Sequence, residues 1–93
     1  MTLQEAIWEI ISRNFKPGDI FDSHSVIFLL SRNEKYVETY MKNISPEMNI
    51  KQYHAHIAKN ISLFDDCVEA VDEKIITPNI FGELSKNQLW KRK

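Results

Sequence analysis

The sequence contains few of the residues on which several common kinds of protein depend. In 93 residues there are one cysteine, two glycines and three prolines. The single cysteine, Cys67, excludes an internal disulfide and a cysteine-rich zinc site, so we expect a reducing, cytoplasmic environment. Two glycines leave no room for a glycine-rich phosphate loop, and so few glycines and prolines predict few disordered linkers. We therefore expect one domain over residues 1–93.

Long apolar runs are also missing. No run approaches the ~20 residues of a membrane span, and the amino terminus lacks the basic, apolar and small-residue parts of a secretion signal. We therefore expect neither membrane insertion nor secretion. Hydrophobic residues make up 43% and charged residues 27% of the chain, which is typical of a soluble globular protein.

Apolar residues recur at steps of three and four over the first two thirds of the chain, which is typical of helices. Thr2 and Glu5 have the spacing of a capping box, so a first helix should begin at Leu3 and end near Asn14, before a proline and a glycine.

Three further segments follow before the middle of the chain. Residues 19–21 allow only a short strand. Asp22 or Ser23 can cap a second helix that ends near Arg32. The apolar spacing over residues 33–43 predicts a third helix, with its cap at the first of these residues.

Residues 48–64 predict the longest amphipathic helix. One stripe is apolar and should face a core: Ile50, Tyr53, Ile57, Ile61 and Phe64. At roughly 100° per residue, the opposite face carries Lys51, Gln52, Ala55, His56, Lys59 and Ser62. That face contains no acid, so it is a candidate surface for a negatively charged partner.

Beyond residue 66 the apolar period changes to two, which is typical of a strand. Residues 67–72 should form it, and Ile75 and Ile76 can extend it. A long turn region should follow, and residues 88–92 can return as the antiparallel partner, with Leu89 or Trp90 covering the core. The fold class we predict is mainly α with a small β-hairpin: three or four helices and a C-terminal hairpin.

This order of elements resembles a winged helix-turn-helix domain. The resemblance covers most of the chain and depends on two stretches, KPGDIFDSHSVIFLL and YHAHIAKNISLFDDCVEAVD. It implies that a recognition helix enters the major groove of DNA and that the hairpin, or wing, touches the backbone or minor groove. Residues 33–47 intervene where the family has a short turn, which leaves open whether they cover that helix. We assign the recognition helix to residues 48–64, because they lead directly into the hairpin.

The charge distribution fits that resemblance. Residues 48–64 have two lysines and no acid, residues 84–93 have four basic residues and no acid, and residues 65–83 have six acids and one lysine. The net charge is −1, so these differences are hidden in the total. We therefore expect double-stranded DNA as the partner and a small transcription regulator or DNA-targeting module as the function.

The side chains expected to contact DNA follow from their chemistry. Amides read adenine edges, cations contact phosphate or guanine, and a small residue permits close approach. The expected contact residues are Asn49, Lys51, Gln52, Ala55, His56, Lys59, Lys86, Lys91, Arg92 and Lys93.

The same fold could instead serve as a protein–protein interaction module without direct DNA contact. Trp8 and Tyr40 are candidate anchors if they form an exposed apolar patch. The acids of residues 65–83 would repel a duplex if they faced it, so a monomer should bind DNA weakly and a homodimer could be needed.

Nothing in the sequence indicates catalysis, a metal or a cofactor. His54 and His56 would lie about 200° apart on a helix and could not share an ion. Ser23, His24 and Ser25 are adjacent, but adjacency does not supply the geometry of a catalytic triad. We expect no enzyme, although the residues are silent on a role as a small enzyme subunit or a mobile-element accessory factor.

Overall fold

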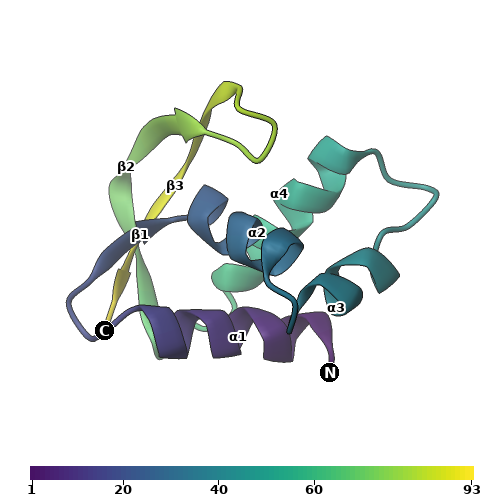
Figure 1. Cartoon of the computed structure of the whole chain (residues 1–93). Helices are drawn as coiled ribbons and strands as arrows, with labels where there is room; N and C mark the ends of the chain where they lie inside the picture. Colours follow the sequence, from purple (N-terminus) through teal and green to yellow (C-terminus); the bar gives the residue numbers. More distant parts are fainter.

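A computed structural model describes all residues, 1–93, and combines four helices with a three-stranded antiparallel sheet (Figure 1). The elements in chain order are α1 (Leu3–Asn14), β1 (Ile20–Asp22), α2 (Ser23–Arg32), α3 (Val37–Lys42), α4 (Ile50–Ile61), β2 (Val68–Pro78) and β3 (Leu84–Arg92). The chain is therefore an α+β protein, as its sequence predicts.

The first two helices have the bounds that the sequence predicts, because their caps form. The Thr2 hydroxyl accepts a hydrogen bond from the Glu5 amide, and the Glu5 carboxylate accepts one from the Thr2 amide, both at 3.1 Å. At the start of α2, the Asp22 carboxylate accepts from the Ser25 amide at 2.9 Å. These bonds satisfy amides that have no partner within the helix.

The predicted third helix over residues 33–43 is wrong at its beginning, since α3 covers only Val37–Lys42. Asn33 is instead the C-terminal cap of α2. Its side chain accepts from the Lys35 amide at 2.9 Å, and its carbonyl accepts from the Tyr36 amide. Asparagine often forms such local bonds in place of helical ones, and here they make a turn.

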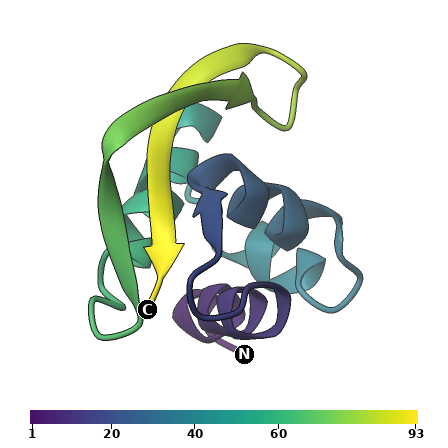
Figure 2. The same cartoon turned by 90° about the vertical axis from the view of Figure 1, so that its left-hand side faces the viewer.

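The sheet has the order β1-β3-β2, and the hairpin is longer than predicted. β2 runs to Pro78, two residues past the extension that Ile75 and Ile76 allow, and β3 begins at Leu84 rather than at residue 88. Residues 71–73 leave the ladder as a bulge, because Ala70 pairs with Trp90 and Lys74 already pairs with Gln88. Figure 2 shows the resulting long, curved hairpin beside the helices.

The turn between β2 and β3 is short and well fixed. The Asn79 side chain accepts from the amides of Phe81 and Glu83, at 2.9 and 3.1 Å. Gly82 has φ +81°, in the left-handed region that favours glycine. The predicted long turn region is therefore only residues 79–83, and its side chains have defined positions.

One hydrophobic core joins all four helices to the sheet. Tyr53, Ile57 and Ile61 of α4 are buried in it, and Ile50 and Phe64 pack at its edge, which confirms the predicted stripe. Trp90 covers the core from β3, as predicted. None of the helices has the length and apolar character needed to cross a bilayer.

Candidate nucleic-acid interface

The acid-free face of α4 is open to solvent. The predicted contact residues on this helix are all exposed: Lys51, Gln52, Ala55, His56 and Lys59. Residues 33–47 therefore do not cover the face, and the question left open by the sequence is answered. Burial of the opposite stripe fixes this orientation, since Tyr53 and Ile57 are almost fully enclosed.

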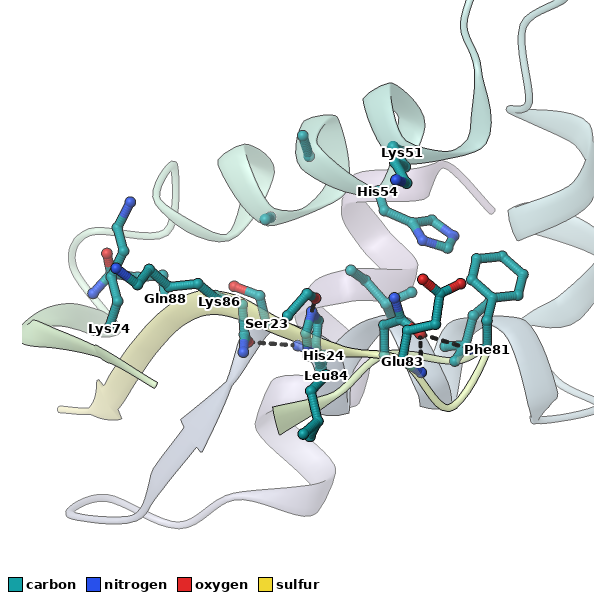
Figure 3. Close-up of a pocket in the computed structure, with 17 residues that line it drawn as sticks. Ser23, His24, Lys51, His54, Lys74, Phe81, Glu83, Leu84, Lys86 and Gln88 are labelled. Carbon is teal, nitrogen blue, oxygen red and sulfur yellow. Dashed lines mark hydrogen bonds between the residues drawn. The ribbon is translucent and has the colours of Figure 1, made fainter. Parts of the chain in front are cut away.

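A groove of about 580 Å³ separates α4 from the β2–β3 hairpin (Figure 3). Lys51 comes from the α4 side, and Lys74 and Lys86 come from the hairpin. The small side chains of Ala55 and Ala58 line the α4 wall and leave the space open. With three lysines and one glutamate, the lining has a formal charge of +2 in a chain whose net charge is −1.

The sequence does not predict that Lys74 belongs to this site. It is the one base in an acid-rich segment, and its neighbours Asp72 and Glu73 suggest a negative surface. Only the strand register, which pairs Lys74 with Gln88 just beyond the bulge, brings it to the groove. That register depends on contacts between distant residues and has no local pattern.

The acids of residues 65–83 lie mostly away from the groove. Glu83 is the only one of the six that lines it. The other five precede Lys74 in the loop before β2, the first part of β2 and its bulge: Asp65, Asp66, Glu69, Asp72 and Glu73. The expected repulsion of a duplex therefore concerns the base and the bulge of the hairpin rather than the groove.

Asn49 and Gln52, expected to read adenine edges, form a capping box at the start of α4. The Asn49 side-chain oxygen accepts from the Gln52 amide at 2.8 Å, and the Gln52 side-chain oxygen accepts from the Asn49 amide at 3.0 Å. Bidentate reading of adenine needs both the oxygen and the nitrogen of an amide. The expected role therefore does not fit unless the cap opens.

Arg92, expected to hold a phosphate, is directed into the protein. Its guanidinium donates to the carbonyls of Phe15 and Ser12, near the end of α1, and lies 5.6 Å from the centre of the Trp8 ring. The side chain is half-buried, and its Nε is enclosed without a partner. These contacts satisfy the last carbonyls of α1, so the expected phosphate contact does not fit.

The terminal lysines are also separated from the groove. Lys91 lies opposite Glu69 in the strand register, and the Lys93 ammonium donates to the Asp65 carbonyl at 2.6 Å. At about 3.4 Å per residue, Lys91 is roughly 17 Å along β3 from Lys86. The structure thus places Lys86 at the groove and Lys91 and Lys93 at the base of the hairpin.

A chain of hydrogen bonds attaches the hairpin to the start of α2. Thr77 donates to the Asp22 carboxylate at 2.8 Å, so its oxygen accepts from Nδ1–H of His24 at 2.9 Å. Nε2 of His24 then accepts from the Ser85 hydroxyl at 3.2 Å. The partner of His24 is therefore Ser85 of β3, not adjacent Ser23 or Ser25.

This chain of bonds holds the hairpin wall of the groove in place. Burial by itself raises the pKa of Asp22, but the hydrogen bonds from Ser25 and Thr77 outweigh it and hold the pKa below its usual value. The carboxylate therefore remains ionised and keeps its partners at neutral pH. Although hydrolases also use a serine–histidine pair, here Nδ1 of His24 meets a hydroxyl rather than a carboxylate.

His54 closes one end of the groove (Figure 3). Its Nε2 is 2.7 Å from the Tyr40 hydroxyl, and its ring stacks on Phe81 with centroids 6.0 Å apart. Burial lowers the pKa of His54, and nearby His24 lowers it further, so His54 is neutral at pH 7. His56 is exposed, and nowhere in residues 1–93 do three His, Cys, Asp or Glu side chains gather as metal ligands do.

The half-buried, neutral His54 makes stability depend on pH. The unfolded chain binds a proton at this position at a higher pH than the folded chain does. We expect the free energy of unfolding to fall as the pH drops from about 7 to about 5, below the ordinary histidine pKa of about 6.5. Urea denaturation at a series of pH values measures this.

The variant His54→Gln is the control for that prediction, because its side-chain oxygen can still accept from Tyr40. Its unfolding free energy should change less between pH 7 and pH 5 than that of the wild type. The stability contributed by ionised Asp22 is lost only below about pH 4, which is outside the range from pH 7 to pH 5. Equal slopes in the two proteins would show that His54 is not the source.

Trp8 and Tyr40 do not form the exposed patch considered for a protein partner. Tyr40 is 5% exposed, and Trp8 packs against Phe64 with ring centroids 5.6 Å apart. The most exposed apolar side chains of the hairpin are instead Ile76 and Leu84, at 61% and 72%. On the hairpin, these two side chains rather than Trp8 and Tyr40 are therefore available for apolar contact with a partner.

Comparisons of the chain with models of protein families, with curated proteins and with solved structures found no match. The functional inference therefore depends on the fold and on the interface described above.

Proposed function

We propose that the chain is a winged-helix protein that binds double-stranded DNA, as a small transcription regulator or a DNA-targeting module. One observation carries the proposal. The acid-free, exposed face of α4 continues into a groove with a formal charge of +2, in a chain that is acidic as a whole. Such a concentration of positive charge attracts a polyanion.

The order of the elements supports the winged-helix assignment. β1 lies between α1 and α2 in the chain and pairs with β3, and the β2–β3 hairpin follows α4 closely. α4 takes the place of the recognition helix and the hairpin takes the place of the wing. The short α3 is an addition, and it leaves the open face of α4 free.

The dimensions of the interface are compatible with a duplex. Twelve residues make α4 about 18 Å long, and the major groove is about 12 Å wide and admits one helix. The groove beside α4 would then receive the phosphate backbone, with Lys51 on one side and Lys74 and Lys86 on the other. Lys59 continues the same charge along α4.

Binding of a labelled, random-sequence duplex at several salt concentrations tests the proposal. If these four lysines each neutralise one phosphate, the logarithm of affinity should fall with the logarithm of salt concentration with a slope of about −3.6. Affinity should then drop about 150-fold between about 50 and about 200 mM salt. No binding at about 50 mM salt, or an affinity that salt does not change, would contradict DNA binding.

A protein–protein interaction module is the second candidate. The observation that favours it is the exposure of Ile76 and Leu84 on the hairpin, since apolar side chains are often covered by a partner. The same measurement separates the two functions. Association through apolar side chains persists at high salt, whereas association through lysines and phosphates does not.

A further inference from the structure

We infer that the protein binds duplex DNA through its phosphates and tolerates any base sequence. This inference depends on the proposed function and narrows it, favouring a DNA-targeting or DNA-covering role over recognition of one operator. Base sequence is read by side chains that donate or accept two hydrogen bonds at a base edge. Almost every such side chain near the interface is already engaged within the protein.

The three arginines of the chain all have contacts within the protein, and none of them lines the groove. Arg13 pairs with Glu9 at 3.3 Å. Arg32 donates to the Ile80 carbonyl at 3.2 Å and lies over an aromatic ring, and Arg92 donates to carbonyls at the end of α1. Bidentate arginine is the commonest reader of guanine, so the usual means of recognising a G·C pair is missing here.

The amides of α4 are engaged as well. Asn49 and Gln52 use their side-chain oxygens on each other's backbone amides, and these two bonds hold the first turn of the helix. Reading adenine with either amide would require the cap bond made by its side-chain oxygen to break. The loss of an N-terminal cap costs about 1 kcal/mol of helix stability, which opposes that rearrangement.

The amides of the groove lining are similarly occupied. Asn79 caps the hairpin turn. Asn87 accepts from the His24 amide at 3.0 Å and donates to the Thr77 hydroxyl at 3.0 Å, so both ends of its side chain are engaged. Gln88 donates to two backbone carbonyls, at 2.6 and 2.9 Å. These bonds stabilise the hairpin. The side-chain amides of the groove lining therefore have a structural role and are not available to DNA.

The side chains that remain free at the interface are lysines, which are suited to binding phosphate. Lys51, Lys59, Lys74 and Lys86 are exposed and have no salt-bridge partner. A lysine ammonium acts as a mobile point charge and imposes little geometry on its ligand. On the open face of α4, His56 is the one other polar side chain without a hydrogen bond inside the protein, because the Ser62 hydroxyl donates to the Lys59 carbonyl at 2.6 Å. A single bond from His56 could favour one base position but could not define a site.

Two measurements test the inference on the full chain. The first compares the affinity for duplexes of random, G·C-rich and A·T-rich sequence at one salt concentration. The second selects bound molecules from a randomised duplex pool over several rounds. We expect the three affinities to agree within about threefold and the pool to yield no consensus, where operator-specific proteins prefer their site by ~10³-fold or more.

A pair of variants distinguishes phosphate contact from base reading. Lys59→Ala should weaken binding to every duplex by the same factor and reduce the salt slope by about 0.9. Gln52→Ala should leave the relative affinities of the three duplexes unchanged. A consensus bound about 100-fold more tightly than random duplex would overturn sequence tolerance while leaving DNA binding intact. No duplex binding at about 50 mM salt would overturn both.

Discussion

Charge reversal on both sides of the groove, in Lys51→Glu/Lys86→Glu, should nearly abolish binding to duplex DNA. The two lysines line opposite walls of the groove, one from α4 and one from β3. The loss of two phosphate contacts reduces the salt slope by about 1.8, which corresponds to about 200-fold weaker binding at about 50 mM salt and about 20-fold at about 200 mM. Fluorescence anisotropy with labelled duplex measures both values.

The variant Lys16→Glu/Lys93→Glu is a matched control. Like the groove variant, it changes the net charge of the chain from −1 to −5. Lys16 lies in the turn after α1, which bonds to Arg92 near the C-terminus, and Lys93 ends the chain beside it. Both positions are therefore near the base of the hairpin, and neither lines the groove. We expect a loss of less than about tenfold, from long-range charge alone. Equal losses in the two variants would refute the assignment of the groove as the binding surface.

The second large effect concerns stability. Ile57→Ala should lower the free energy of unfolding by about 3 kcal/mol, because Ile57 is 0% exposed beneath α4 and its removal leaves a cavity. For a domain of this size the melting temperature should fall by about 12–24 °C. Thermal unfolding followed by circular dichroism measures the shift.

His56→Ala provides the comparison on the same helix. His56 is exposed one position before Ile57, and replacement of an exposed side chain away from caps and pairs changes stability by at most about 0.5 kcal/mol. The contrast between adjacent residues tests the orientation of α4, on which the proposed interface depends. If both substitutions lower the free energy of unfolding by the same amount, α4 does not expose the face assigned to it.

The helices were predictable because their determinants are local. The caps at Thr2 and Asp22 and the apolar stripe of α4 are readable within a few residues, and all are confirmed. The fourth predicted helix was only too long, since Asn49 caps it and it ends at Ile61. The third failed at its start because the local bonds of Asn33 favour a turn.

The groove could not be predicted, because distant residues form it. Lys74 and Lys86 reach it through the register of β2 and β3, and His24 meets Ser85 across 61 positions of the chain. The same limit applies to Arg92, whose basic character suggests a phosphate contact, whereas its place beside the end of α1 gives it internal partners. Composition indicates which charges exist, but tertiary contacts decide which remain free.

The bulge in β2 also has a consequence for behaviour at high concentration. β2 is an edge strand, so one side of its backbone has no neighbour in the sheet. Residues 71–73 interrupt that edge and place Asp72 and Glu73 in its middle. Because a bent, negatively charged edge resists alignment with a second strand, the chain can keep a long hairpin exposed without assembling into intermolecular β-sheets or fibrils.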